Sequence, residues 1–491
     1  MQAPEPSVRI ARHRPRIYEK MSSLIDTLRR LERQTRPSDA ETEVALARRF
    51  AELPVHGRTP AQLMGRRVGG CEGTHGVFPR CNFGCRPCYH TKTANTVRID
   101  GPHTLREVES QMRYLRERRG PGQFAQLIGG EASLLDPDDH ASALEIMRKH
   151  GRVPMSFTHG DFDYAYLERL ALGPDGKPRT PLLSFAAHFD TTMRGRRGIP
   201  RPKREQDLNE YRATFCAMFA RLKREHGVRS YLAHNMTVTP ANVGEIAGVI
   251  RDCRAMGFRM FSFQPAAYVG DERRWTEDFR SIGAEEVWRE IESGAGTRLP
   301  YRAVQMGDER CNRVTWGLYV GDRYVPILDD QNPRDLAARD AFYRAFPRNF
   351  TFASRPVMAT RVVRAAAARP RDAATGARYA ARLMRRLGPA AVRSDIRPVT
   401  FVMHRFMDAE DVREAWKLTK AGIVSDDAQI LETQERLAAC AYGMAHPESD
   451  EIVPACVQHS ILDVDETHQL AQILPLRRRL PSPEPGSPDV A

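Results

Sequence analysis

Short apolar runs alternate with longer amphipathic stretches between residues 74 and 266. The runs have the length and composition of β-strands, and the longer stretches, such as 105–119, 211–226 and 242–256, repeat apolar residues at helical spacing. Alternation of this kind predicts βα units that build one parallel sheet. The strand candidates are Thr74–Pro79, Phe124–Gly129, Pro154–Thr158, Leu182–Phe189, Ser230–Val238 and Arg259–Ala266.

The chain on either side of this region has other patterns. Residues 1–15 and 482–491 are rich in proline or polar residues, so we expect loose ends there. Apolar residues from Ile17 to Leu31 recur at helical spacing and predict an amphipathic packing helix. We therefore divide the chain into a helical extension (1–70), a core (71–300), a cysteine-containing auxiliary domain (301–475) and a tail (476–491).

The auxiliary region combines hairpins with a basic helical stretch. One hairpin is predicted after Cys311, and a second lies between Cys440 and Cys456. Residues 361–388 hold eight arginines and one acidic residue and break at Pro370. A solvated surface is the usual role of such a stretch, and a membrane-surface or substrate-docking helix is the alternative.

The composition restricts the classes of protein to which the chain can belong. The 491 residues, 41% of them hydrophobic, are enough for two or three domains. A net charge of +13, mostly from arginine, fits either an anionic partner or a diffuse basic surface. The N-terminus lacks an apolar leader, and no run of eighteen apolar residues occurs, so we expect a cytoplasmic protein that can associate peripherally with a membrane.

Three cysteines lie close together directly after the first strand candidate. Cys81, Cys85 and Cys88 have the spacing C-x3-C-x2-C. Thiolates are preferred ligands of iron–sulfur clusters, and three of them on a [4Fe–4S] cluster leave one iron open for chemistry. Zinc is the alternative, because Cys71 or His90 could supply a fourth ligand.

An apolar run that ends in Gly129-Gly130-Glu131 follows the cysteines. Together the two motifs resemble the radical S-adenosylmethionine (SAM) superfamily. This resemblance implies an α/β fold with a partial (β/α)6 TIM-type barrel and reductive cleavage of SAM at the open iron. An unactivated C–H bond then loses its hydrogen to the resulting radical. An electron-donating reductase, ferredoxin or flavodoxin would be the partner.

The resemblance also assigns SAM-binding roles at the ends of the strands. Glu131 would hold the SAM amino group, which needs a carboxylate when buried. Gly129 and Gly130 would allow a close backbone approach to the methionine part. Asp190, Asn235 and Gln264 would contact the ribose, carboxylate or adenine. Tyr89 would take over part of the adenine contact, since Pro87 stands where relatives have an aromatic or apolar residue.

The remaining cysteines separate into two groups. Cys216 and Cys253 lie in amphipathic helix patterns, where free cysteine behaves as a small apolar residue. Cys311, Cys440 and Cys456 lie beside turns, so we expect an auxiliary [4Fe–4S] cluster, with scattered structural thiols as the alternative. Its fourth ligand would be Cys71, a histidine such as His446, or the substrate.

A narrower resemblance comes from the C-terminal half. The segments FSFQPAAYVG (261–270), MHRFMD (403–408) and ERLAAC…VPAC (435–456) resemble the tetraether-lipid synthase branch, which couples lipid chains. This implies lipid-chain modification or coupling at a membrane surface. Peptide or nucleotide modification is the enzymatic alternative. A metal-binding protein that contacts nucleic acid is the non-enzymatic one, although zinc-finger spacing and stacking aromatics are missing from the sequence, so we expect no nucleic-acid partner.

Overall fold

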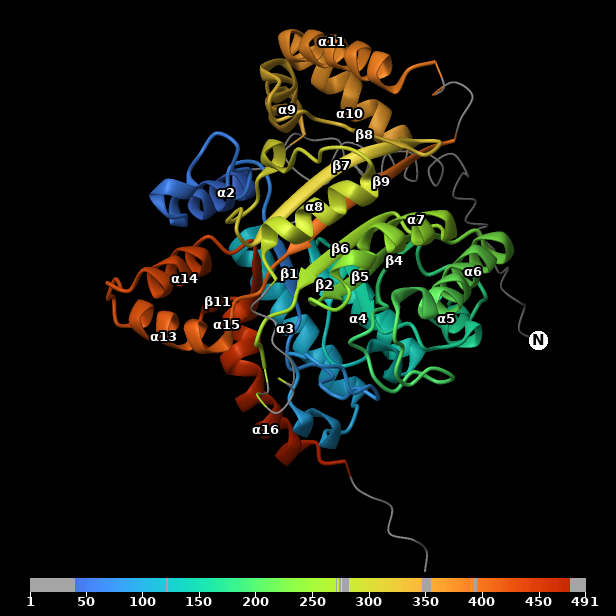
Figure 1. Ribbon diagram of the computed structural model, residues 1–491, viewed down its shortest axis with the longest axis vertical. Helices are drawn as coiled ribbons and strands as arrows, with labels where there is room; N and C mark the ends of the chain where they lie inside the picture. The colour runs from blue at the N-terminus through green and yellow to red at the C-terminus, as the bar shows by residue number, and fades with distance from the viewer. Residues whose placement is uncertain are drawn as a thin grey trace, which may run out of the picture.

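The fold is built around one sheet of eleven strands, in the order β11-β10-β1-β2-β3-β4-β5-β6-β9-β7-β8 (Figure 1). The computed structural model describes residues 40–476 except 121, 271, 273–274, 276–281, 347–354, 390 and 392–394. Neighbouring strands from β10 to β9 are parallel, and β11, β7 and β8 join antiparallel. The strands are β1 (Cys71–Gly73), β2 (Gln123–Leu127), β3 (Arg152–Thr158), β4 (Leu182–His188), β5 (Arg229–Val238), β6 (Met260–Pro265), β7 (Asn312–Val320), β8 (Arg323–Pro326), β9 (Ile396–His404), β10 (Tyr442–His446) and β11 (Glu451–Pro454).

Helices follow most of the parallel strands, and this confirms the predicted mixed α/β partial barrel. Figure 1 shows α9 to α11 gathered at one end of the molecule and α13 to α16 towards the other. The helices are α2 (Ala40–Glu52), α3 (Gly101–Arg119), α4 (Pro137–Lys149), α5 (Tyr164–Ala171), α6 (Asn209–His226), α7 (Ile246–Met256), α8 (Ala284–Ala295), α9 (Pro333–Ala345), α10 (Arg355–Ala368), α11 (Pro370–Leu387), α13 (Ala409–Lys420), α14 (Ala428–Ala438), α15 (Ala455–Val457) and α16 (Asp463–Ile473).

Local sequence signals fix where helices begin and end. Asp100 caps α3 by accepting a hydrogen bond from the backbone N–H of His103, and Gly120 follows the last turn. Asp136 caps α4 in the same way, and Pro137 stands at its first position. These helices therefore start close to where the hydrophobic pattern predicts.

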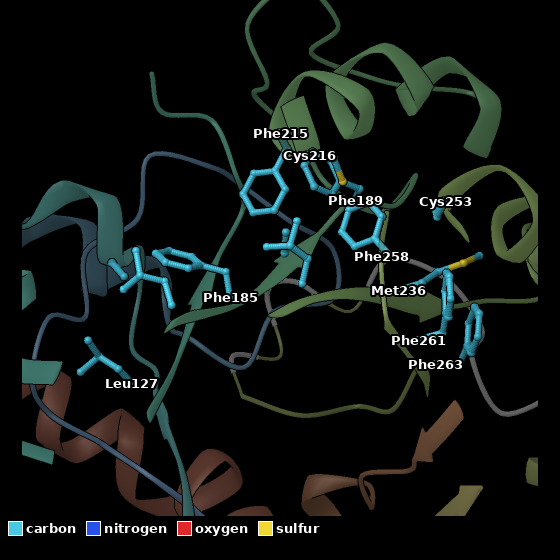
Figure 2. Packing of buried hydrophobic residues seen from close by; sticks show 14 of the residues in the cluster. Leu127, Phe185, Phe189, Phe215, Cys216, Met236, Cys253, Phe258, Phe261 and Phe263 are labelled. Carbon is cyan, nitrogen blue, oxygen red and sulfur yellow. The ribbon is translucent and has the colours of Figure 1, made fainter. Parts of the chain in front are cut away.

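The main core lies between the sheet and the helices that cover it. Figure 2 shows Phe185, Phe215, Phe258 and Phe261 packed in this layer. Burial of such side chains contributes about 1.5–3 kcal/mol each. Cys216 and Cys253 are buried in the same cluster, which confirms their predicted structural role.

The first strand was predicted in the wrong place. The pattern favoured Thr74–Pro79, but the strand is Cys71–Gly73, and Val77 and Phe78 are buried in the loop that follows. The strand was hidden because its middle residue is the fully buried Glu72, whose carboxylate pairs with Arg152 at 2.9 Å. A buried charge of this kind is tolerated only when it is paired.

Residues 301–475 extend the sheet at both edges. Strands β10 and β11 pair beside β1, and β9, β7 and β8 pair beside β6. Both cysteine-flanked hairpins are confirmed, as β7–β8 and β10–β11, and the basic stretch is helical with a break before Pro370. The predicted helix at Ile17–Leu31 and both loose ends lie outside the described residues. Among the described helices, none has both the length and the apolarity to cross a bilayer.

Candidate functional site

The three clustered cysteines lie in a loop that is bonded to several neighbouring segments. The backbone N–H of Cys81 donates to Asn95 Oδ1 at 3.0 Å. Gly84 N–H donates to the carbonyl of Arg194 at 2.9 Å, in the loop after β4. The ring of Phe83 stacks on His159 at 3.9 Å, at the end of β3. The cysteine loop is thus held against the C-terminal ends of the parallel strands, where barrel enzymes keep their active sites.

Gly129-Gly130-Glu131 lies directly against this loop. Gly130 N–H donates to the Phe78 carbonyl at 2.7 Å, and Glu131 N–H donates to the Arg80 carbonyl at 2.9 Å. A Cβ at Gly130 would stand 2.1 Å from the Arg80 carbonyl oxygen. Within the chain, the absent side chain therefore serves the close approach of the cysteine loop.

The Glu131 side chain is a buried carboxylate with a full set of donors. Its oxygens accept from Thr158 Oγ1 at 2.6 Å, His159 N–H at 2.7 Å and Ser133 N–H at 2.9 Å. Burial opposes ionisation, but the His159 imidazole and these donors outweigh it and lower the pKa of Glu131. The carboxylate is thus kept charged beside the cysteine loop.

Asp190 lies on the other side of the cysteine loop, after β4. Its carboxylate accepts from the N–H and Oγ1 of Thr192, at 2.9 and 2.6 Å, and from Thr237 N–H at 2.9 Å. Burial opposes ionisation, but His188 and these donors lower the pKa of Asp190. Its charge acts on Cys85, whose pKa it helps to raise.

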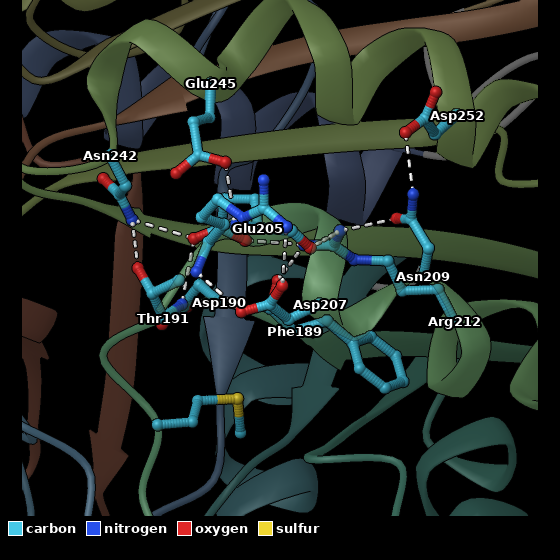
Figure 3. A network of polar contacts seen from close by, with 12 residues as sticks. Phe189, Asp190, Thr191, Glu205, Asp207, Asn209, Arg212, Asn242, Glu245 and Asp252 are labelled. Carbon is cyan, nitrogen blue, oxygen red and sulfur yellow. Dashed lines mark hydrogen bonds and ion pairs between the residues drawn. The ribbon is translucent and has the colours of Figure 1, made fainter. Parts of the chain in front are cut away.

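A buried ion pair braces the loop that carries Asp190 (Figure 3). Arg212 Nη2 contacts Glu205 Oε2 at 2.6 Å and donates to the Phe189 carbonyl at 2.7 Å. Glu205 Oε1 accepts from Thr191 N–H at 2.9 Å and from Asn242 Nδ2 at 3.0 Å. The network fixes Asp190 relative to the ends of β4 and β5.

The two other predicted SAM contacts face the inside of the barrel. Asn235 pairs in register with Ser262, and Thr237 pairs with Gln264. The Nδ2 atom of Asn235 is buried and has no hydrogen-bond partner among the described residues. Neighbouring His234 instead packs against Phe258 and Phe261 under the helices. The structure therefore brings Glu131 and Asp190 to the cysteine loop, and Asn235 and Gln264 to the adjacent barrel wall.

The three thiols lie near one another in the loop. Burial, followed by the neighbouring Cys88 and Cys81, raises the pKa of Cys85 well above its usual value, so the thiols lie within electrostatic reach of one another. Thiolates in such an arrangement could hold an iron–sulfur cluster or, with a fourth ligand, a zinc ion.

Cys311, Cys440 and Cys456 come from three distant segments. Burial, with Cys440 and then Cys311, raises the pKa of Cys456, so the three thiols lie within electrostatic reach of one another. Burial also raises the pKa of Cys311 to about 11, although Arg436 opposes this by donating from Nε to Cys311 Sγ at 3.0 Å. A buried cation beside buried thiols favours the thiolate form that binds metal.

The two proposed fourth ligands differ in position. Cys71 packs in the same apolar cluster as Cys440 and Tyr442, on the inner face of the sheet. His446 lies elsewhere, because its Nε2 meets Gln458 Oε1 at 2.6 Å and its ring stacks on His75 at 4.1 Å. Of the two, Cys71 is the one placed beside the second cysteine set.

A row of aromatic rings connects the two cysteine sets. It starts at Tyr89, next to Cys88, where the hydroxyl donates to the Gly129 carbonyl at 2.9 Å. The centroid distances are 4.2 Å from Tyr89 to His459, 5.7 Å from His459 to Phe406, 5.1 Å from Phe406 to His404 and 6.0 Å from His404 to Tyr442.

Two members of this row were missed from the sequence and have unpaired polar atoms. His459 Nδ1 pairs with Asp463 at 2.7 Å, while its buried Nε2 has no partner among the described residues, nor has the Tyr442 hydroxyl. The i,i+4 spacing of His459 and Asp463 was the only available signal. The sequence gives no sign that His459 packs against Tyr89, because the two residues lie hundreds of positions apart.

Comparisons with known proteins give weak structural similarity. No protein-family model and no curated protein matches the chain. SuiB from Streptococcus suis aligns over 56% of each chain, with 13% identity and a TM-score of 0.33. TYW1 with a lysine-pyruvate adduct aligns over 56% of this chain and 89% of its own, with 9% identity and a TM-score of 0.31. A third structure, anSMEcpe with bound AdoMet, has 12% identity over 45% of this chain and 56% of its own, and a TM-score of 0.29.

The similar part of this chain thus spans about half the length of SuiB.

Proposed function

We propose that this chain is a radical SAM enzyme. The observation that carries the proposal is the direct bonding of the cysteine loop to Gly129-Gly130-Glu131, through Gly130 to Phe78 and Glu131 to Arg80. Two motifs forty residues apart thereby form one site at the C-terminal ends of the strands. Cys81, Cys85 and Cys88 would hold a [4Fe–4S] cluster, which when bound supplies an electron and an open iron for SAM.

The other residues of the site would bind and orient SAM. Glu131 presents a charged carboxylate in a buried place, which suits an ammonium group. The unpaired Nδ2 of Asn235 and the side chain of Gln264 offer hydrogen bonds along the barrel wall. Asp190 takes a positioning role, since its carboxylate joins Thr192 in the loop after β4 to Thr237 in β5. Electrons would come from a reductase, ferredoxin or flavodoxin.

The second cysteine set would hold an auxiliary cluster. Its support is the convergence of Cys311, Cys440 and Cys456 around Arg436, with Cys71 nearby. Metal binding there would tie β7, β10 and α15 together, because such binding is coupled to folding. The substrate would lie between the two sets, near the row of rings.

The favoured substrate class is a lipid chain, modified or coupled at the membrane surface. The inner face of the sheet supports this class, because Ile128, Phe157, Met444 and Phe406 belong to one apolar cluster that also includes Tyr89 and Cys440. The unpaired Tyr442 hydroxyl and His459 Nε2 would then meet a polar group close to the reacting carbon. Apolar surroundings with few polar groups suit an alkyl substrate with one polar end.

The test is SAM cleavage by the anaerobically reconstituted, reduced protein. We expect 5′-deoxyadenosine from the wild type and none from a Cys81/Cys85/Cys88→Ala variant. A protein that retains iron but yields no 5′-deoxyadenosine under any reductant would overturn the proposal. Lipid extracts of cells with and without the gene then test the substrate class, and unchanged extracts would contradict the lipid assignment alone.

A further inference from the structure

Helix α11 uses one face to attach itself to the protein. Asp372 pairs with Arg344 of α9 at 2.7 Å. Here the arginines lie on α11 instead: Arg382 and Arg386 each pair with the buried carboxylate of Asp335 on α9, at 3.0 Å. The charged side chains named on this inner face are therefore all engaged in ion pairs within the protein.

The opposite face of α11 is exposed and basic. Arg371, Arg378 and Arg385 repeat every seven residues, which places them along one side of the helix. All three are exposed, and none forms an ion pair with a described residue. The other exposed residues on this arc are small or apolar, namely Ala374, Ala377, Ala381 and Met384. This face carries cations and apolar groups and no carboxylate.

Helix α10 contacts α11 and exposes further aliphatic side chains. Val362 and Val363 are 48% and 67% exposed, and Met384 of α11 is 53% exposed. Residues 355–388 contain nine arginines and a single acidic residue, so both helices lie in a strongly positive segment. Exposed aliphatic side chains beside unpaired arginines mark an amphipathic surface of the kind that lies in a membrane interface.

We propose that α10 and α11 form a docking surface for a membrane that contains anionic phospholipid. Arginines would meet the lipid phosphates, and Val363 and Met384 would reach the boundary of the acyl chains. A nucleic acid fits less well, because the only aromatic residue of α11, Tyr379, turns inwards and donates to the Ile327 carbonyl.

The docking surface lies away from the cysteine loop. Figure 1 shows α10 and α11 at the opposite end of the molecule from α16. Helix α16 contacts the segment before the cysteine loop, through Glu466 and His75. A membrane bound at α10 and α11 would thus hold the enzyme without covering that loop. Membrane docking rests on the proposed function in that it would bring the enzyme to a membrane, where a lipid substrate is found.

The test is flotation of the full-length protein with vesicles of phosphatidylcholine, with and without phosphatidylglycerol. We expect binding only to the anionic vesicles, weakened by salt. Each arginine near an anionic surface contributes roughly fivefold to binding, so R371Q/R378Q/R385Q should bind about 100-fold more weakly. The matched control is R106Q/R224Q/R289Q, which removes the same charge from exposed positions on α3, α6 and α8.

Three results would overturn the proposal: equal loss in the control variant, equal binding to neutral vesicles, or no vesicle binding by the wild type. Tighter binding of single-stranded RNA, lost in the same α11 variant, would reassign the face to nucleic acid. Vesicle binding requires neither iron nor SAM. A failure here is therefore distinguishable from a failure of SAM cleavage, and a melting curve shows that each variant is folded.

Discussion

Replacing Glu131 tests how the carboxylate organises the site. The side chain is 1% exposed and accepts three hydrogen bonds, of 2.6, 2.7 and 2.9 Å. Hydrogen bonds to a charged group contribute about 1.5–3 kcal/mol each, but they are not additive. Removing the acceptor leaves these three buried donors without a partner, and at about 1–3 kcal/mol for each the combined cost is roughly 3–5 kcal/mol. We expect Glu131→Ala to lower the free energy of unfolding by about that amount.

SAM affinity should fall in the same variant. Loss of a buried charge partner costs about 2–5 kcal/mol in binding, or roughly 30- to several thousand-fold. Thr158→Val is the matched control, because it removes the 2.6 Å hydrogen bond but keeps the carboxylate. It should cost about 1.5–3 kcal/mol in unfolding and change SAM affinity only a few-fold.

Urea unfolding and calorimetric titration with SAM measure the two effects separately. Since the folded-state pKa of Glu131 is lowered, its stabilising contribution is present above the unfolded pKa and is lost as pH falls through the folded pKa. Measurements at neutral pH therefore record the full effect. An unfolding cost below about 1 kcal/mol for Glu131→Ala, or equal loss of SAM affinity in Thr158→Val, would refute the reasoning.

Three further predictions concern the surroundings of the site. Burial opposes protonation of His75, but Glu466 raises the pKa of His75 to about 9. The pair should therefore stabilise the fold by about 3 kcal/mol below pH 6.5, and this contribution should disappear as the pH rises through 9. Urea unfolding across that pH range measures the change. Arg152→Ala should destabilise the fold by about 3–5 kcal/mol, because it leaves Glu72 buried without its partner. Gly130→Ala should displace the cysteine loop and remove its iron while the second set keeps its own, as iron counting would show.

Each of these predictions has its own control. His75→Gln should flatten the pH dependence, and an unchanged slope would show that other groups cause it. The double variant Glu72→Gln/Arg152→Met should recover much of the lost stability, whereas full additivity would mean that the pair does not interact. Gly244→Ala has open space around the new Cβ and should leave iron content unchanged.

Local patterns predicted the parallel strands and the covering helices because each carries its signal within a few residues. Strand β1 was missed for the opposite reason. Its sequence Cys71-Glu72-Gly73 has no apolar run, and its place depends on Arg152 from β3 and on pairing with β10. The apolar Val77 and Phe78 gave a false strand signal, since they bury in a loop.

The residues of the candidate site also fall into two groups, those in local sequence motifs and those placed by contacts between distant segments. The cysteines of the 81–88 loop and Gly129-Gly130-Glu131 are local motifs and could be found from spacing. His404 and Tyr442 could not, because they meet only when β9 pairs beside β6 and β10 pairs beside β1. His459 could not either, because it lies in the helical segment Gln458–Leu462, far in sequence from Tyr89, which it contacts. That Cys311, Cys440 and Cys456 share one cluster stays a prediction, whereas the hydrogen bond from Arg436 to Cys311 required the structure.

Iron counting after anaerobic reconstitution tests the central claim most directly. The wild type should hold two clusters of roughly four irons each. The Cys81/Cys85/Cys88→Ala variant should retain one cluster and lose all SAM cleavage, and the Cys311/Cys440/Cys456→Ala variant should lose the other. Stoichiometric zinc without iron in the wild type, or unchanged iron and SAM cleavage in the first variant, would contradict the account.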